Sequence, residues 1–499
     1  MFLTDSKKQN LTMSYLLGFD VGSSAVKIGI LDLNGRTVVA CRKGYPTEEP
    51  RPGFKEQNPE LWWEAVVGAI REVTREIDTG RLLAIGSAGN ICSHTFLDER
   101  GKLLRPSLGF QDQRAASEVD ELLSATTRQE LASELGADFP PAATWPLPRL
   151  LWFRKNEPAI LERTRYLIHA KDFINFRLTG EIASDVSSNR GLVNLSSGLL
   201  ASTILKKLKL PDHFVPRLHG PEQVMGRVST QAAVETGLPP GLPVVAGWND
   251  LNASVLGSGL TPASHAFDIT GTSEHVGIVN SSTYRAAGLI SIPFFRGKHL
   301  FYGVTSNGGG ALTWYARALG MNINDMLRLA EATPAGCEGL MFLPYLDGER
   351  APVWDPRASA AFVGIRSRHD LGHFVRAILE GVVLGLQQIW ELLKSEAGAQ
   401  AGPIVASGGA ARAHLWNQIK ADVWGRELRV LENVDAAVVG AAILAAVGTA
   451  QHPSFEVAAD AMVRTREACV PARRDEFYQH LGSRYRRIYP ALRQIFSEP

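Results

Sequence analysis

Two short turns in the sequence combine residue types that could hold a phosphate group. Residues 22–24 read Gly-Ser-Ser and residues 271–273 read Gly-Thr-Ser, so each turn offers a glycine and two small hydroxyl side chains. Backbone N–H groups in such a turn can donate to phosphate oxygens, because no bulky side chain stands in the way. Taken alone, the first turn is also typical of a plain hairpin.

Asp20 lies two residues ahead of the first turn, although a carboxylate and a phosphate repel each other. A Mg²⁺ ion between them would remove this conflict, because Mg²⁺ is usually held by one or two carboxylates together with substrate phosphates. Asp20 is therefore the candidate metal ligand.

Asp250 follows an apolar strand and Gly247, and it precedes the small, turn-prone stretch "NASVLGSG". Phosphoryl transfer needs a carboxylate that accepts the proton of the attacking hydroxyl, and Asp250 suits this role. An Asp directly before a helix is equally typical of an N-cap. The two roles are compatible.

The composition narrows the possible functions. The formal net charge of +1 gives no electrostatic attraction to nucleic acid or to an anionic membrane. The longest small-apolar run, residues 436–450, contains glycines and is too short for a membrane span, so it predicts a buried helix. Four separated cysteines without a Cys-x-x-Cys pattern predict neither disulfides nor a zinc site and fit a reducing cytoplasm. Motifs of P-loops, dinucleotide sites, hydrolase elbows and zinc proteases are absent from the sequence.

Mixed strands and helices must position these residues. Apolar runs at residues 16–21 and 26–33 predict a hairpin, and Asn34-Gly35 predicts a second turn after it. The stretch "NPELWWEAVVGAIREV" predicts a helix that Asn58 caps, and residues 82–89 predict a buried strand.

The order of strand, glycine turn and strand starts again at residues 264–279, after an apolar strand at 244–247. This restart predicts an α/β protein with two similar halves, which agrees with a length of 499 residues. The predicted ranges are a disordered or non-native extension at 1–13, with Met13 as a possible natural start, a first domain at 14–259 and a second domain at 260–499.

Long segments of the chain resemble the FGGY family of carbohydrate kinases. They include "GLMFLPYLDGERAPVWDPRASAAFVGI" at 339–365, "VRAILEGVVLGLQQ" at 375–388 and a segment at 404–428 that is similar to the family's adenosine-binding segment. The resemblance implies two actin/hexokinase-like (ribonuclease H-like) domains with ATP and sugar in an interdomain cleft. It also implies an ATP-dependent kinase acting on a ketose or sugar alcohol, similar to xylulose kinases. The alternatives are a kinase of the same fold for another polyol, aldonate or ketohexose, and a sugar-independent actin-like ATPase.

The resemblance also implies roles for individual residues. Asp20 would lie near Mg²⁺, and Asp250, in the family's Gly-x-x-Asp block, would be the catalytic base. The implied ATP-binding residues are Gly22, Ser23, Ser24, Lys27, Gly271, Thr272, Ser273, Gly308, Gly309, Gly408, Gly409, Ala410 and Arg412.

The sugar pocket is where this sequence departs from its relatives. In xylulose kinases the segment corresponding to residues 89–98 resembles Gly-Gln-Met-His-Gly, whereas Ile91 and Cys92 stand at the matching positions here. Neither side chain offers a strong hydrogen bond to a polyol, which disfavours glycerol. Trp248 would cover an apolar face of the sugar. The implied substrate-binding residues are Ile91, Cys92, Asp112, Trp248, Asp250 and Leu251.

Three further residues have plainer interpretations. His94, alone beside a predicted strand, is more typical of a hydrogen-bonded core residue than of a ligand. Glu349 and Arg350, in the "GER" triplet, are interpreted as an interdomain ion pair with a structural role rather than as a substrate contact. The expected cofactors are ATP and Mg²⁺, and the expected substrate is a small sugar or polyol. The expected location is the cytoplasm, and neither a nucleic acid nor a membrane is expected as a partner. A homodimer is compatible with the sequence.

Overall fold

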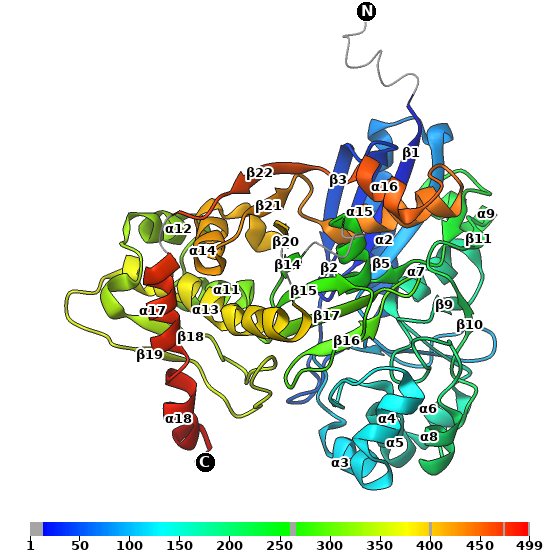
Figure 1. Ribbon diagram of the computed structural model, residues 1–499. Coiled ribbons are helices and arrows are strands. Elements are labelled where there is room, and N and C mark those ends of the chain that lie inside the picture. The colour runs from blue at the N-terminus through cyan, green and yellow to red at the C-terminus, as the bar shows by residue number, and fades with distance from the viewer. Residues whose placement is uncertain (1–12, 260–265, 399–401, 473–474, 498–499) are drawn as a thin grey trace, which may run out of the picture. The chain divides into compact units, whose positions relative to one another are not determined.

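The computed structural model describes residues 13–259, 266–398, 402–472 and 475–497 (Figure 1). Residues 1–12 of the predicted N-terminal extension, and the first two residues of the predicted restart at 264–279, lie outside these ranges. The chain divides into two compact units, Met1–Thr261 with Ala436–Val463 and Pro262–Asp435 with Arg464–Pro499. The chain therefore returns to the first unit at Ala436 and leaves it again after Val463.

A mixed seven-stranded sheet forms the centre of the first unit. Its strands β1 (Tyr15–Val21), β2 (Ala25–Asp32) and β3 (Thr37–Gly44) are antiparallel neighbours, and β5 (Leu82–Gly89) lies parallel to β1. Two short strands, β12 (Pro243–Val245) and β13 (Trp248–Asn249), pair parallel with β5, while β11 (Val224–Arg227) pairs antiparallel with β12. The predicted hairpin, the turn after it and the predicted strand at 82–89 are confirmed.

Helices cover this sheet, so its central strands are apolar on both faces. The helix α2 (Pro59–Val73) packs on β2 and β3, and the side chain of Asn58 caps it by accepting from the backbone N–H of Glu60 at 3.0 Å. The apolar stripe of α2 that includes Trp62 and Ile70 is buried, and the predicted capped helix is confirmed.

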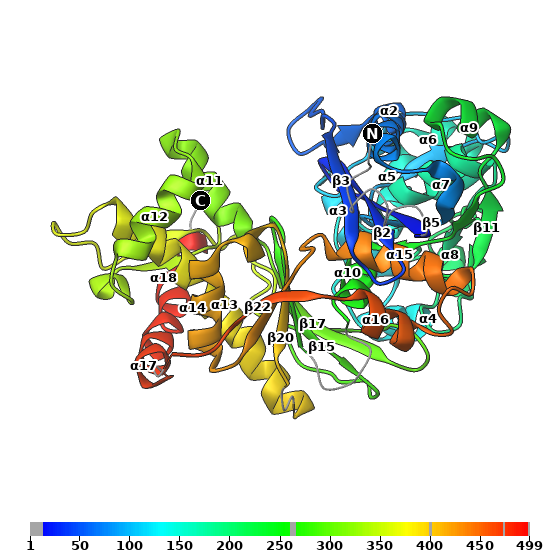
Figure 2. The same ribbon diagram turned by 90° about the horizontal axis from the view of Figure 1, so that it is seen from above.

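The helix α15 (Ala436–Gly448) is the element that returns to the first unit. It packs against β1, β5 and α10 (Asp250–Gly257), and α16 (Phe455–Met462) packs on it in turn. Figure 2 shows α15 beside the blue strands. Glycines make this close approach possible. A Cβ atom on Gly86 would lie 1.8 Å from the carbonyl oxygen of Ala441, and one on Gly440 would lie 1.9 Å from that of Ala253. The predicted buried helix is confirmed.

The sheet of the second unit repeats the arrangement of the first. Its strands β14 (Ala266–Thr270), β15 (Glu274–Asn280) and β17 (His299–Thr305) are antiparallel neighbours, and β20 (Ile404–Gly408) lies parallel to β14. The sheet is completed by β16 (Ile290–Pro293), β21 (Leu428–Leu431) and β22 (Thr465–Cys469). The predicted α/β class and the repeated strand, turn and strand order are thus confirmed.

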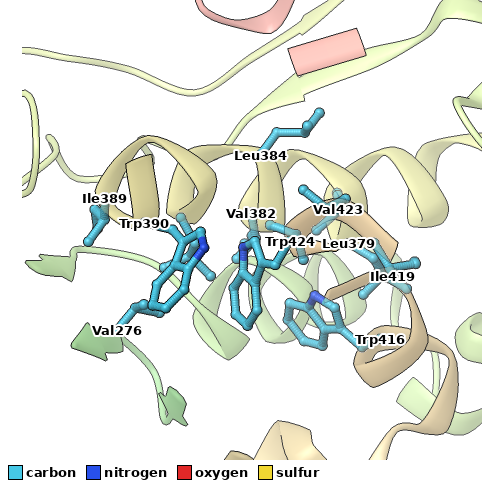
Figure 3. Packing of buried hydrophobic residues seen from close by; sticks show 14 of the residues in the cluster. Val276, Leu379, Val382, Leu384, Ile389, Trp390, Trp416, Ile419, Val423 and Trp424 are labelled. Carbon is cyan, nitrogen blue, oxygen red and sulfur yellow. The ribbon is translucent and has the colours of Figure 1, made fainter. Parts of the chain in front are cut away.

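The long helix α13 (Leu371–Ala397) and the shorter α14 (His414–Trp424) bury the core of the second unit. Figure 3 shows Trp390 of α13 in one buried cluster with Trp416 and Trp424 of α14 and with Val276 of β15. This core packs against the strands of the second sheet, and the ends of these strands carry the second glycine turn.

The remaining elements are shorter. Among all helices of the described residues, none is long and apolar enough to cross a membrane. The other helices are α3 (Ala116–Ala125), α4 (Arg128–Leu135), α5 (Pro146–Asn156), α6 (Pro158–Arg163), α7 (Ala170–Thr179), α8 (Ser202–Lys207), α9 (Thr230–Thr236), α11 (Gly309–Leu319), α12 (Ile323–Ala332), α17 (Asp475–Tyr485) and α18 (Ile488–Ser497). The other strands are β4 (Glu56–Gln57), β6 (Thr95–Leu97), β7 (Ser107–Leu108), β8 (Tyr166–Ile168), β9 (Ala183–Asp185), β10 (Arg217–His219), β18 (Met341–Leu343) and β19 (Ala361–Val363).

Candidate active site

The carboxyl ends of three parallel strands meet at one edge of the first sheet. In the strand register, Val21 at the end of β1 and Asn249 at the end of β13 both pair with Gly89 at the end of β5. Ligand sites in α/β sheets form at the carboxyl ends of strands. This edge therefore brings together Asp20, the loop after β5 and Asp250.

The first glycine turn is held from behind by polar side chains. The carbonyl oxygen of Gly22 accepts a hydrogen bond from the hydroxyl of Tyr45. The carbonyl oxygen of Ser23 accepts one from the side-chain amide of Gln57 at 2.7 Å. The side chains of Ser23 and Ser24 are exposed. The turn thus has a fixed backbone and small, accessible hydroxyl groups.

Lys27 and Asp20 face each other across the same hairpin. They are register partners in β1 and β2, and the Lys27 Nζ atom lies 3.8 Å from Oδ2 of Asp20. Asp20 is 5% exposed, so this acid lies inside the unit just below the turn.

Asp250 occupies the first position of α10. The N-cap is the preceding residue, Asn249, whose side-chain oxygen accepts from the backbone N–H of Asn252 at 2.9 Å. The alternative interpretation of Asp250 as the cap is therefore wrong. Its Oδ1 atom accepts from the backbone N–H of Leu251 at 2.8 Å, which leaves Oδ2 to face other partners.

Burial raises the pKa of Asp250 to about 7, and the negative charge of Asp20 adds to the rise. A carboxyl group with this pKa can both take and hold a proton near neutral pH. Asp20 and Asp250 repel each other electrostatically at the ends of two parallel strands. Two such carboxylates are also a suitable pair to share a divalent cation.

In the second unit, the structure brings three predicted nucleotide segments together. Thr270 pairs with Gly408 in the parallel strands β14 and β20, so the turn at 271–273 and residue 409 lie at the same edge. The N–H groups of Gly308 and Gly309 donate to the carbonyl oxygens of Thr272 and Gly271 at 2.8 and 3.0 Å.

Glycine is required at two of these positions. A Cβ atom on Gly408, which has a φ of +88°, would lie 2.2 Å from the carbonyl oxygen of Thr270. One on Gly309 would lie 2.8 Å from that of Gly271. Ala410 follows in a short turn that ends at Arg412, whose guanidinium lies 3.4 Å from the carboxylate of Asp435.

A buried ion cluster that sequence reasoning missed lies behind the second turn. The Nζ atom of Lys420, on α14, is 2.5 Å from carboxylate oxygens of both Asp268 and Glu274 and 2.8 Å from the hydroxyl of Thr270. All three charged side chains are at most 1% exposed. The cluster joins the two strands that flank the turn. Its only sequence signal is an acid, Glu274, placed directly after a glycine turn.

Glu349 also supports a predicted nucleotide segment. Its carboxylate accepts from the backbone N–H groups of Ser306 at 2.6 Å and Arg350 at 2.7 Å, and burial raises its pKa to about 7. The guanidinium of Arg350 donates to the carbonyl of Thr305. Both residues thus hold the chain just before Gly308, which agrees with a structural role.

The loop after β5 carries the first of the predicted sugar residues. Cys92 is buried and has a φ of +63°, a left-handed conformation that is uncommon for a residue other than glycine. Its carbonyl oxygen accepts from the guanidinium of the buried Arg149 at 2.5 Å, and the same guanidinium lies 3.0 Å from Nδ1 of His94. His94 is thus the hydrogen-bonded core residue that was predicted, and burial lowers its pKa far below the usual value.

Two predicted sugar residues are buried among other partners. Asp112 is fully buried and binds the guanidinium of Arg114 through both carboxylate oxygens. Trp248 is 2% exposed and stacks on Phe455, with ring centroids 6.4 Å apart. Because both side chains are buried against other residues, we do not expect either to contact the sugar. Ile91 and Leu251, the sequence neighbours of Cys92 and Asp250, are half-buried.

Comparisons with known proteins agree with this geometry. The N-terminal domain of the FGGY family of carbohydrate kinases matches residues 15–257, and its C-terminal domain matches residues 267–449. Xylulose kinase of Bacillus subtilis (strain 168) is 29% identical over 501 residues, which cover 97% of this chain and 98% of that protein.

Solved structures show the same architecture. Gluconate kinase from Lactobacillus acidophilus matches with a TM-score of 0.86 at 26% identity, over 96% of this chain and 98% of that one. Xylulose kinase from Rhodospirillum rubrum matches with a TM-score of 0.84 at 28% identity, over 97% and 100%. The predicted two-domain kinase fold is confirmed. The chain belongs to the FGGY family of carbohydrate kinases and is an ATP-dependent sugar kinase of the xylulose kinase-like type.

Proposed function

We propose that this kinase transfers the γ-phosphoryl group of ATP to a primary hydroxyl of a ketopentose, with Asp250 as the catalytic base. The observation that carries the proposal is the position of Asp250 at the carboxyl end of β13, next to the buried Asp20. The choice of a ketopentose is supported by relatives named xylulose kinase, which match this chain over almost their whole length.

Asp250 would accept the proton of the attacking hydroxyl. A base works best when its pKa lies near the working pH, because it is then deprotonated and still a useful proton acceptor. Burial gives Asp250 such a pKa, about 7. Its bond to the N–H of Leu251 would hold the carboxylate in one orientation during the transfer.

Asp20 would hold Mg²⁺, which supplies positive charge to neutralise the phosphates during transfer. The residues fit such an ion, since Asp20 is buried directly below a turn of small residues and beside a second acid. Lys27 adds a positive charge to the same hairpin and would pair with a phosphate oxygen. ATP would contact the hydroxyl groups and N–H groups of Gly22, Ser23 and Ser24.

The loops of the second unit would bind the rest of the nucleotide. Gly271 and Thr272 are exposed, and a Cβ atom on Gly409 would meet nothing within 4 Å, so a ligand can approach the backbone there. The proposed contacts are those of Gly271, Thr272, Ser273, Gly308 and Gly309 with phosphates and ribose, and those of Gly408, Gly409, Ala410 and Arg412 with the adenine.

An aldonate is the second candidate substrate, and one observation favours it. Burial raises the pKa of Asp250, and the positive charge of Arg190 opposes this rise. The guanidinium of Arg190 therefore interacts electrostatically with the proposed base. Its centre lies 5.2 Å from the ring centroid of Phe139. A cation near the reacting hydroxyl would suit a sugar acid, and one solved relative is a gluconate kinase.

The test is an ADP-release screen of the purified protein with Mg²⁺ and ATP. The panel contains ketopentoses, ketohexoses, aldonates, tetritols and glycerol. A ketopentose should raise ADP release well above the rate without sugar, and replacement of Arg190 by methionine should lower that rate only in part, because the loss of the cation raises the pKa of Asp250. If an aldonate gives the larger rate and Arg190→Met abolishes it, the second candidate is correct. A flat response across the panel would contradict both.

We expect kcat/KM to rise with pH with a midpoint near pH 7 and to level off at higher pH, because only deprotonated Asp250 can accept the hydroxyl proton. Replacement of Asp20 by asparagine removes a negative neighbour, stabilises the charged form of Asp250 and should move the midpoint to lower pH. The measurement is the pH–rate profile of both proteins, including the residual activity of the variant. A midpoint near pH 4 in the unmodified protein would contradict this prediction.

A cytoplasmic location and a homodimer complete the proposal. Four unpaired cysteines are compatible with a reducing compartment, where ATP is available. Light scattering on the purified protein tests the dimer.

A further inference from the structure

A buried lysine of the first unit has no role in the reaction described above. The Nζ atom of Lys171, in the first turn of α7, is 2.5 Å from Asp172 and 2.9 Å from Asp185, and it donates to the carbonyl of Ala246 at 3.2 Å. The three charged side chains are at most 1% exposed. Although burial opposes both shifts, the facing charges raise the pKa of Lys171 and lower that of Asp185.

Such a cluster needs an explanation other than stability. Removing charges from water costs several kcal/mol per ion, and apolar side chains of similar size often stabilise a core equally well. Buried ionic groups are retained in some proteins because they specify one arrangement of the chain. The partners of Asp185 show which arrangement this cluster would specify.

Asp185, at the end of β9, accepts from two neighbouring serines. Its Oδ1 atom binds the N–H of Ser187 at 2.9 Å, the hydroxyl of Ser187 at 2.6 Å and the N–H of Ser188 at 3.1 Å. Its Oδ2 atom accepts from the hydroxyl of Ser188 and from Lys171. The carboxylate thus fixes the turn that follows β9.

Ser187 connects this turn to the segment that carries the proposed base. Its hydroxyl oxygen accepts from the side-chain amide of Asn249 at 2.8 Å, while the amide oxygen of Asn249 caps α10 by accepting from the N–H of Asn252 at 2.9 Å. The two bonds use opposite ends of one amide group, so they fix its orientation. Asn249 is 4% exposed and directly precedes Asp250.

We propose that Lys171, Asp185 and Ser187 are positioning residues that hold Asn249, and through it the first turn of α10, so that the carboxylate of Asp250 keeps one position for the reaction. This inference rests on the proposed role of Asp250. Catalytic groups must be held within about 0.5 Å of their working geometry by neighbours whose own side chains are fixed. The hydrogen-bonded chain from Lys171 to Asn249 supplies such support from a rigid, charged anchor.

The two serines provide a matched experiment, because each gives one hydroxyl group to the same carboxylate and only Ser187 also reaches Asn249. The variants are Ser187→Ala, Ser187→Thr and Ser188→Ala in the full chain. The first measurement is amide hydrogen exchange of the segment 250–257 in the ligand-free protein. The second is kcat and the KM for ATP with the best sugar of the screen.

We expect Ser187→Ala to speed exchange in the first turn of α10 and to lower kcat, each by about fivefold to tenfold, with an unchanged KM for ATP. Ser187→Thr restores both values because it keeps the hydroxyl, and Ser188→Ala changes neither. Equal effects of Ser187→Ala and Ser188→Ala would overturn the inference, since they would show only a loss of local stability. An unchanged exchange rate in Ser187→Ala would also overturn it. If no sugar is phosphorylated, the proposed function fails, and the exchange measurement still decides whether Ser187 holds α10.

Discussion

Replacement of Asp250 by asparagine should lower kcat by about 10²–10⁴-fold, the usual contribution of a general base. Asparagine has the same shape, and its side-chain oxygen can still accept from the N–H of Leu251, which lies 2.8 Å from Oδ1 in the present structure. What it cannot do is take the proton of the attacking hydroxyl. The KM for ATP should stay within about threefold, because the predicted ATP residues are left in place. The measurement is steady-state ADP release at saturating sugar and ATP.

The control for this variant is Asp120→Asn, which changes an exposed aspartate of α3 in the same unit. It should keep the full kcat. Circular dichroism should be the same in both variants, and the melting temperature of Asp250→Asn should be no lower than that of the control, because Asp250 is not the helix cap and burial opposes the charge that the variant removes. If Asp250→Asn keeps more than a tenth of the kcat, another group accepts the proton and the assignment of the base is wrong.

Local sequence patterns predicted much of the fold. The hairpin β1–β2, the capped helix α2 and the strand β5 each have their signal within the element itself, as alternating or continuous apolar residues next to Gly, Pro or Asn. These signals work because turn and cap geometry depend on a few neighbouring residues. The repeat of strand, turn and strand at β14–β15 could be recognised for the same reason.

The path of the chain between the units could not be predicted in this way. The apolar run at 436–450 predicted a buried helix but not its place, against β1 and β5 of the first unit. The contact with β5 depends on Gly86, which leaves room for the backbone of α15 at Ala441, hundreds of residues away, and the contact with α10 depends on Gly440, which leaves room for the backbone at Ala253. A sequence pattern shows that such glycines exist, but only the folded chain shows which backbone fills the space.

The candidate site was predictable where a residue follows a strand and less so where it depends on burial. Asp20, the two turns and Asp250 all lie at strand ends, and their positions follow from the order of strands and turns. The choice between Asn249 and Asp250 as the cap could not be made, because both residue types are good caps and they are adjacent. The roles of Asp112 and Trp248 depend on which side chains surround them, and Arg114 and Phe455 became visible as their partners only in the structure.

Replacement of Lys420 by methionine should destabilise the second unit by about 3–5 kcal/mol, the cost of breaking a buried ion pair by removing one partner. Asp268 and Glu274 would then face each other without the ammonium group that lies 2.5 Å from both. The KM for ATP should rise as well, because β14 and β15 carry the turn at 271–273. The measurement is the urea dependence of hydrogen exchange in peptides from β14 and β20, which follows the second unit separately from the first.

Two variants make this prediction specific to buried charge. Arg328→Met removes a cation of the same unit whose pair with Asp325 has a similar distance, 2.8 Å, but exposed side chains, 75% and 54%. It should cost less than about 1 kcal/mol, because solvent already screens that pair. The triple variant Lys420→Met, Asp268→Asn, Glu274→Gln removes the uncompensated charges and should recover part of the lost stability. If Lys420→Met and Arg328→Met are equally stable, the cluster does not hold the two strands, and the packing of α14 alone positions the turn.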